Sequence, residues 1–139
     1  MTTSELLKSL SAENCSLDNY FSDNEDSFVN EDIKEFWENL IEKNARSKSN
    51  IINKADVNYC YFYDIINGRK MPTKDKVIRL ALAMKLNLDE CQKALKLSGR
   101  SALYPRLRRD SILIYAIENK LTIFRCDELL EKYGEECLK

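Results

Sequence analysis

Apolar residues recur at the spacing of an amphipathic helix soon after Asn30. They stand at i, i+3, i+4, i+7 and i+8, as Ile33, Phe36, Trp37, Leu40 and Ile41. This period places all of them on one face of an α-helix. The pattern therefore predicts a helix with a single buried stripe at the start of the main body.

A second, short helix is predicted next. Either Ser47 or Ser49 can cap its N-terminus, and its apolar residues are Ile51, Ile52 and Ala55. The pattern breaks at residues 56–58. Asp56 tolerates the left-handed backbone conformation that a tight turn requires.

A third helix is predicted from Tyr59 to about Asn67. Asn58 is a good N-cap for it, and Gly68 is a natural residue to follow its last turn. Pro72 prevents the helix from continuing. Two short helices separated by three residues are therefore expected.

The rest of the chain predicts four more helices. Thr73 caps the first of these, and Asn87 with Glu90 forms a capping box for the next. Pro105 is placed just inside the start of a helix over 105–119, and the last helix runs over about 122–133. The core face of the helix after Thr73 consists of Val77, Leu80, Ala81 and Met84.

The apolar run over residues 112–117 exceeds what one face of a helix needs. Such a run is either deeply buried within the monomer or half buried in a dimer interface. The sequence leaves both readings open.

Charge divides the chain unevenly. Residues 1–32 hold eight acidic residues and one Lys, a net charge of −7, whereas residues 33–139 carry +6. This asymmetry indicates an acidic leader over 1–30, in which residues 4–10 can form a short helix. The helical pattern after it is interpreted as a body over 31–90 and a helical extension over 91–139, which packs on the body and can serve dimerisation.

Composition narrows the class of protein. Only three Gly and two Pro occur in 139 residues, which argues against a fold of many strands and turns and favours an all-α fold. No apolar run approaches the length of a membrane span, and the first residues lack the pattern of a secretory signal.

The chain has no His and five scattered Cys without a CxxC motif. These features favour reduced thiols in the cytoplasm, with Cys91 and Cys126 buried as small apolar residues, and predict no metal or other cofactor. Histidine, the commonest general base in enzymes, is absent, and so is a glycine-rich phosphate loop. Both absences argue against an enzyme.

Residues 45–90 resemble the lambda-repressor/Cro-like helix-turn-helix proteins, also called the XRE family. The resemblance covers about a third of the chain and lies in an ordered set of anchor, loop and core positions. These positions are Val57, Phe62, Ile65, Gly68, Arg69, Pro72, Leu80, Ala81, Met84 and Leu88. The resemblance implies a lambda-repressor-like bundle, double-stranded DNA as partner, a homodimer, and a bacterial or phage source.

The resemblance also implies residue roles. The helix after Asn58 would enter the major groove, with base-reading positions at Asn58, Tyr59, Cys60 and Asp64. The positions that would contact the DNA backbone are Ser47, Lys48, Tyr61, Arg69, Lys70 and Lys74. Between Arg46 and Arg79 there are eight basic and three acidic residues, and such an excess favours phosphate binding. The base-reading positions depart from the Arg, Lys, Gln and Asn that base readout usually employs.

These features predict a sequence-specific DNA-binding transcriptional regulator, repressor-like in its architecture. The alternative is a protein-interaction module on the same fold, since a fold by itself does not fix a function. Exposed tyrosines on the third helix would serve that alternative. A second basic group, consisting of Arg106, Arg108 and Arg109, is a candidate patch for a protein partner.

Overall fold

The computed structural model describes residues 3–11, 17, 33–44 and 47–139. These residues form eight helices and no strand, so the all-α class predicted from the sequence is confirmed. The chain divides into two compact units, Met1–Glu31 and Asp32–Lys139. The boundary lies one residue from the predicted end of the acidic leader.

The described part of the first unit consists of one helix, α1 (Thr3–Ser11), and residue 17. It confirms the short helix predicted at 4–10. None of its residues is buried, and Leu7 and Leu10 are 61% and 43% exposed. The other expectations for the leader fall on residues outside the described ranges.

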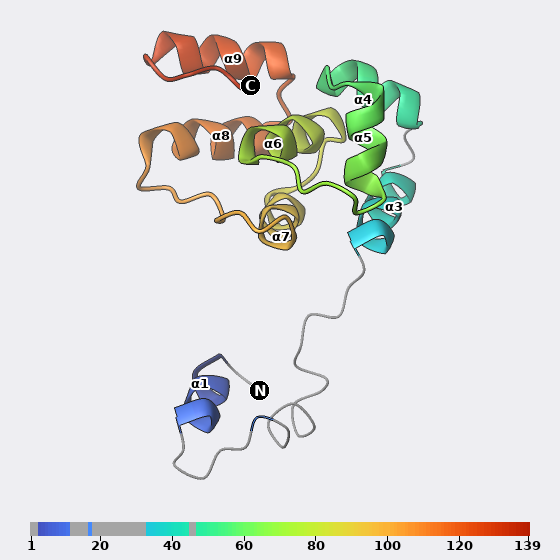
Figure 1. The fold of residues 1–139 in the computed structure, drawn as a ribbon. Coiled ribbons are helices and arrows are strands. Elements are labelled where there is room, and N and C mark those ends of the chain that lie inside the picture. Colours follow the sequence, from blue (N-terminus) through green and yellow to red (C-terminus); the bar gives the residue numbers. More distant parts are fainter. Residues whose placement is uncertain (1–2, 12–16, 18–32, 45–46) are drawn as a thin grey trace. The chain divides into compact units, whose positions relative to one another are not determined.

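The second unit contains seven described helices, of which α6 (Lys74–Ala83) is central. α6 packs against α4, α7, α8 and α9, and in Figure 1 it lies between α4 and α5 on one side and α8 and α9 on the other. The other six helices are α3 (Ile33–Lys43), α4 (Lys48–Ala55), α5 (Tyr59–Ile66), α7 (Leu88–Leu97), α8 (Arg108–Glu118) and α9 (Ile123–Lys132).

α6 is central because it is apolar on nearly every side. Apart from Arg79, every residue from Val77 to Met84 is buried, as expected of a helix enclosed by others. The segments 31–90 and 91–139 therefore share one core. No helix in the described ranges has the length and apolar composition needed to cross a membrane.

The predicted N-caps are present. Ser47 rather than Ser49 caps α4, and its Oγ accepts a hydrogen bond from the N–H of Asn50 at 3.1 Å. The other caps are Asn58, Thr73 and the reciprocal capping box of Asn87 and Glu90.

The predicted start of the sixth helix at Pro105 is wrong. α8 begins at Arg108, and the N–H of Leu107 donates to the carbonyl of Tyr104 at 3.0 Å. Pro105 therefore occupies the second position of a turn, where its fixed φ is favoured. The N–H of Tyr104 also donates to the carboxylate of Asp110 at 3.0 Å, which holds the turn against the first residues of α8.

The apolar run over 112–117 divides between core and surface. Leu113, Ala116 and Ile117 are buried, whereas Tyr115 is 53% exposed. Burial within the unit thus explains only part of the run.

The last residues of the chain pack against the body, which the sequence pattern did not predict. Leu138 is buried, and its N–H donates to the carboxylate of Asp127 at 2.9 Å. The Arg79 guanidinium donates to the carbonyls of Leu138 and Lys139 at 2.8 and 3.2 Å, and to the carbonyl of Ala55 at 3.1 Å. One side chain thus joins the C-terminus to the end of α4.

Asp75 and Arg109 form the second anchor of this C-terminal segment. The two guanidinium nitrogens of Arg109 donate to the two carboxylate oxygens of Asp75, both at 3.0 Å. Arg109 also donates to the carbonyl of Glu136, and the N–H of Lys139 donates to Asp75, again at 3.0 Å. Paired hydrogen bonds of this kind are among the stronger polar contacts in proteins.

Protonation of Asp75 is expected to destabilise the second unit. Burial by itself raises the pKa of this carboxyl. Hydrogen bonds from Arg109 and Lys139 and the charges of Arg109 and Lys74 outweigh burial, so the net pKa is lowered. Because the folded-state pKa is depressed, the stabilisation is present above the unfolded-state pKa of about 3.9 and is lost as pH falls through the folded value. Urea unfolding at a series of pH values should show this loss of stability. The Asp75→Asn variant should show a smaller dependence of stability on pH. Equal pH dependence in both proteins would contradict the assignment.

Candidate nucleic-acid interface

A tight turn over residues 56–58 sets the direction of α5 relative to α4. Asp56 adopts the left-handed conformation with φ 52°, and its N–H donates to the carbonyl of Asn53 at 3.3 Å. Val57 is buried, and so are Phe62 and Ile65 on α5. These apolar contacts fix one face of α5 in the core and leave the opposite face outward.

The outward face of α5 begins with exposed residues. Tyr59 is 63% exposed and Cys60 is also exposed, whereas Tyr61 and Tyr63 are half-buried. The rings of Tyr59 and Tyr63 lie with centroids 4.7 Å apart. The hydrogen bond between their side chains raises the pKa of Tyr59.

Asp64 binds the basic residues that follow α5. Its carboxylate lies 3.7 Å from Nη1 of Arg69 and 3.6 Å from Nζ of Lys70, and its carbonyl accepts hydrogen bonds from both backbone N–H groups. Gly68, with φ 76°, permits this reversal of the chain. Arg69 and Lys70 remain 70% and 58% exposed.

Lys48 lies at the start of α4 beside the aromatic residues. Its ammonium pairs with Glu38 of α3 at 2.9 Å and lies 5.7 Å from the ring centroid of Tyr63. The ammonium of Lys70 lies 5.8 Å from the ring centroid of Tyr61. Cations thus flank the tyrosines on two sides.

Lys74 has a different environment from the one expected of a phosphate contact. Its ammonium forms an ion pair with the carboxylate of Asp110, which is 3% exposed. A buried carboxylate needs such a partner, because an uncompensated buried charge is costly. Lys74 therefore joins α6 to α8.

Two members of the second basic group, Arg108 and Arg109, contact the C-terminal segment over residues 133–137. Arg109 points toward Asp75 and the C-terminal segment, and its side chain is only 22% exposed. Arg108 is 70% exposed and lies 3.8 Å from Glu135, and Arg106 is exposed. Sequence reasoning missed the role of Arg109 because its partners lie 27 to 34 residues away.

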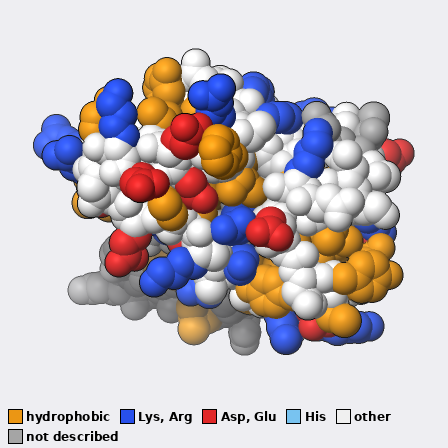
Figure 2. Space-filling view, turned by 90° about the horizontal axis from the view of Figure 1, so that it is seen from above, with side chains coloured by type: hydrophobic (Ala, Val, Ile, Leu, Met, Phe, Trp, Pro, Cys, Tyr) orange, Lys and Arg blue, Asp and Glu red, His pale blue; other side chains and the backbone are white. Residues whose placement is uncertain are grey.

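Charges of both signs mix on the surface seen in Figure 2. Acidic and basic side chains alternate there, with apolar side chains between them. Phosphate binding on such a surface depends on local groups of cations. Arg69 and Lys70 are the most exposed of the cations around α5 that were expected to contact DNA.

Two of the cysteines are buried as predicted. Cys91 and Cys126 are fully buried free thiols, and burial raises the pKa of each to about 12. Cys60 and Cys137 are exposed. The described residues contain no group of three or more metal-ligating side chains placed to hold an ion.

Thiol labelling should separate these two classes. In a Cys15→Ser variant at pH 8, we expect Cys60 to react with a maleimide reagent within minutes, because its thiol is exposed to the reagent. Cys91 and Cys126 should react only as the protein unfolds, and mass spectrometry of peptides would locate the label. Rapid labelling of Cys91 in the folded protein would contradict the buried assignment.

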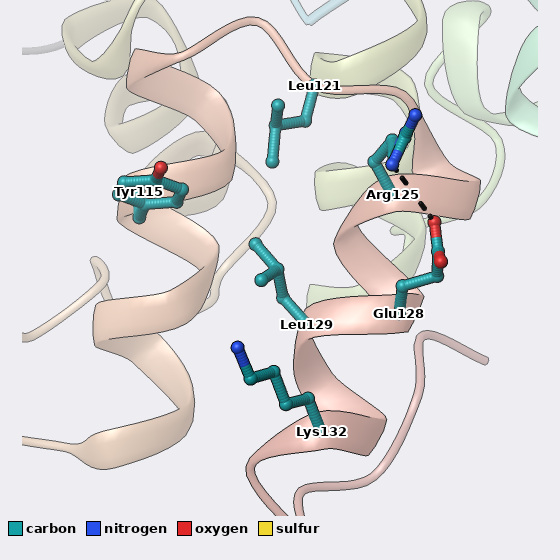
Figure 3. A pocket seen from close by; sticks show the side chains of 6 residues that line it. All are labelled: Tyr115, Leu121, Arg125, Glu128, Leu129 and Lys132. Carbon is teal, nitrogen blue, oxygen red and sulfur yellow. Dashed lines mark ion pairs between the residues drawn. The ribbon is translucent and has the colours of Figure 1, made fainter.

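A furrow of about 540 Å³ lies between α8 and α9. Figure 3 shows Leu121 and Leu129 pointing between the two helices, with Tyr115 on α8 opposite them. Arg125 and Glu128 form an ion pair at 3.7 Å on its edge. Lys132 completes the lining, so the furrow has an apolar floor and carries both signs of charge.

Comparison with known proteins gives no further assignment. Neither the family models, nor the curated proteins, nor the solved structures include a match to this chain.

Proposed function

We propose that this protein is a sequence-specific DNA-binding transcriptional regulator with a lambda-repressor-like helix-turn-helix. In this proposal, α4 and α5 form the two helices of the motif, and α5 enters the major groove. The observation that carries the proposal is the arrangement of α5. Its inner face is fixed by Phe62 and Ile65, its first residues are exposed, and Arg69 and Lys70 follow it directly.

Each group in this interface has a proposed role. Tyr59 and Cys60 approach the base edges, with Asn58 capping the helix and Asp64 holding the cations beside it. Phosphate contacts come from side chains and from the start of α4, where free backbone N–H groups attract anions. The residues proposed to contact the DNA backbone are Ser47, Lys48, Tyr61, Arg69 and Lys70.

The experiment is selection from a pool of random duplex DNA with the purified full-length protein, followed by salt titration of the enriched duplex. We expect an inverted repeat, with binding that weakens steeply as salt increases because phosphate contacts release counterions. A folded protein that enriches no duplex would overturn the proposal. Such a regulator works in the cytoplasm, where free thiols stay reduced.

The furrow between α8 and α9 supports a second proposal, that this protein also binds a protein partner. We propose that the partner is a second copy of this chain, contacting the first through α8 and α9. The furrow carries Arg125 and Lys132 together with Glu128, so two copies related by a twofold axis can pair opposite charges across an apolar centre. A dimer would also place two DNA-binding helices on an inverted repeat.

Leu129→Glu is expected to convert this dimer to a monomer, because it puts a carboxylate in the apolar floor of the furrow. Sedimentation equilibrium over a range of concentrations measures the change. Phe124→Glu is the control, since Phe124 is 71% exposed on the same helix and is absent from the lining of this furrow. A wild-type protein that sediments as a monomer would contradict the dimer.

A further inference from the structure

We propose that α5 recognises thymine through its 5-methyl group, by apolar contact with the ring of Tyr59 and the thiol of Cys60. This inference rests on the proposed DNA-binding function and specifies what that function distinguishes in a base pair. It follows from three features of the outward face of α5.

The first feature is that the exposed start of α5 presents an aromatic ring that packs against other rings. Tyr59 is 63% exposed, yet its ring packs against that of Tyr63 with centroids 4.7 Å apart and planes tilted by 52°. Tyr63 in turn packs edge-on against the buried ring of Phe62 at 5.4 Å. The Tyr59 ring is therefore held in place while part of it faces outward, with the small, polarisable Cys60 beside it.

The second feature is that the neighbouring polar groups are already engaged. The Oδ1 of Asn58 accepts a hydrogen bond from the N–H of Tyr61 at 3.2 Å. An asparagine reads adenine by using its oxygen and its amide nitrogen together, and here the oxygen is occupied. The carboxylate of Asp64 faces the cations of Arg69 and Lys70 at 3.7 and 3.6 Å, and these cations compete with cytosine for it.

The third feature is the chemistry of the groups that remain. A tyrosine hydroxyl both donates and accepts, so it is satisfied by the edge of either an A·T or a G·C pair and discriminates poorly. The thymine methyl is the apolar group that the unmodified major groove offers. Apolar contact with this methyl is therefore the interaction by which this surface distinguishes one base from another.

The test uses the duplex enriched from the random pool, synthesised with deoxyuridine in place of thymine at one position at a time. This replacement removes the methyl and leaves the hydrogen-bonding groups unchanged. At contacted positions we expect binding to weaken about fourfold per methyl, which corresponds to burial of one such group. Equal binding of the thymine and deoxyuridine duplexes at every position would overturn the inference while leaving the DNA-binding function intact.

Variants then assign the effect to Tyr59. Tyr59→Ala should lose the difference between thymine and deoxyuridine at one or more positions, whereas Tyr59→Phe should retain it because the ring remains. Tyr104→Ala is the matched control, since Tyr104 is 51% exposed in the turn before α8, and it should retain the full difference. A Tyr59→Ala protein that keeps the full difference would overturn the role of this ring. If the folded wild-type protein enriches no duplex, the proposed function fails and this inference fails with it.

Discussion

Reversal of charge at Arg69 and Lys70 together, as Arg69→Glu/Lys70→Glu, is expected to weaken DNA binding by roughly a hundredfold at 0.1 M salt. Each phosphate contact contributes about 0.9 to the slope of log affinity against log salt, so the slope should also decrease by about two. Both side chains are mostly exposed and their ion pairs with Asp64 are long. The fold should therefore be unaffected, and fluorescence anisotropy over a salt series measures both quantities.

The matched control is Arg106→Glu/Arg108→Glu, which changes the charge of the protein by the same amount at a different site. Arg108 is as exposed as Arg69, at 70%, and its ion pair with Glu135 is of similar length, 3.8 Å. This control should keep the wild-type salt slope. An equal loss of affinity in both proteins would show that net charge alone governs binding. An unchanged slope in the first would remove Arg69 and Lys70 from the interface.

Lys74→Met is expected to lower the free energy of unfolding by about 3 kcal/mol, because it leaves a buried carboxylate without its countercharge. Asp110 is 3% exposed, and its only other described hydrogen bond comes from the N–H of Tyr104. Urea denaturation at pH 7 measures the loss. If Lys74 were instead a phosphate contact alone, the substitution would leave stability unchanged.

The double variant Lys74→Met/Asp110→Asn tests the cause. Removing both charges should recover a large part of the loss, because the cost comes from the unpaired carboxylate and not from the missing ammonium. Lys76→Met is the control, since Lys76 is half-exposed on the same helix and forms none of the ion pairs found among the described residues. Additive losses in the double variant would contradict the pairing.

Local sequence patterns predicted the helices of the second unit well. The caps at Asn58 and Thr73 and the capping box at Asn87 depend on residues within three positions of each other. The left-handed turn at Asp56 likewise follows from the properties of one residue. Pro105 was misplaced because Pro is equally suited to the first turn of a helix and to the second position of a β-turn. The hydrogen bond from Tyr104 to Asp110 accompanies the second choice.

The candidate interface was predicted only in part. Periodicity placed Phe62 in the core, whereas Tyr59, three residues earlier at the start of the helix, is exposed. Periodicity did not distinguish the cations that remain exposed from those that form ion pairs with buried groups. Lys70 and Lys74 stand four residues apart in a basic segment, yet one remains mostly exposed and the other is paired with a buried carboxylate 36 residues away.

The sequence by itself determined the all-helical class, the caps and turns, and the identity of most core residues, since these follow from side-chain period and from contacts between near neighbours. The tertiary structure decided the rest. It placed Arg79 and Arg109 on the C-terminal segment and Lys74 on Asp110. It also formed the furrow between α8 and α9. The physical reason is that the role of a charged side chain or an apolar face depends on which groups it contacts in the folded protein. These groups are distant from it in the sequence.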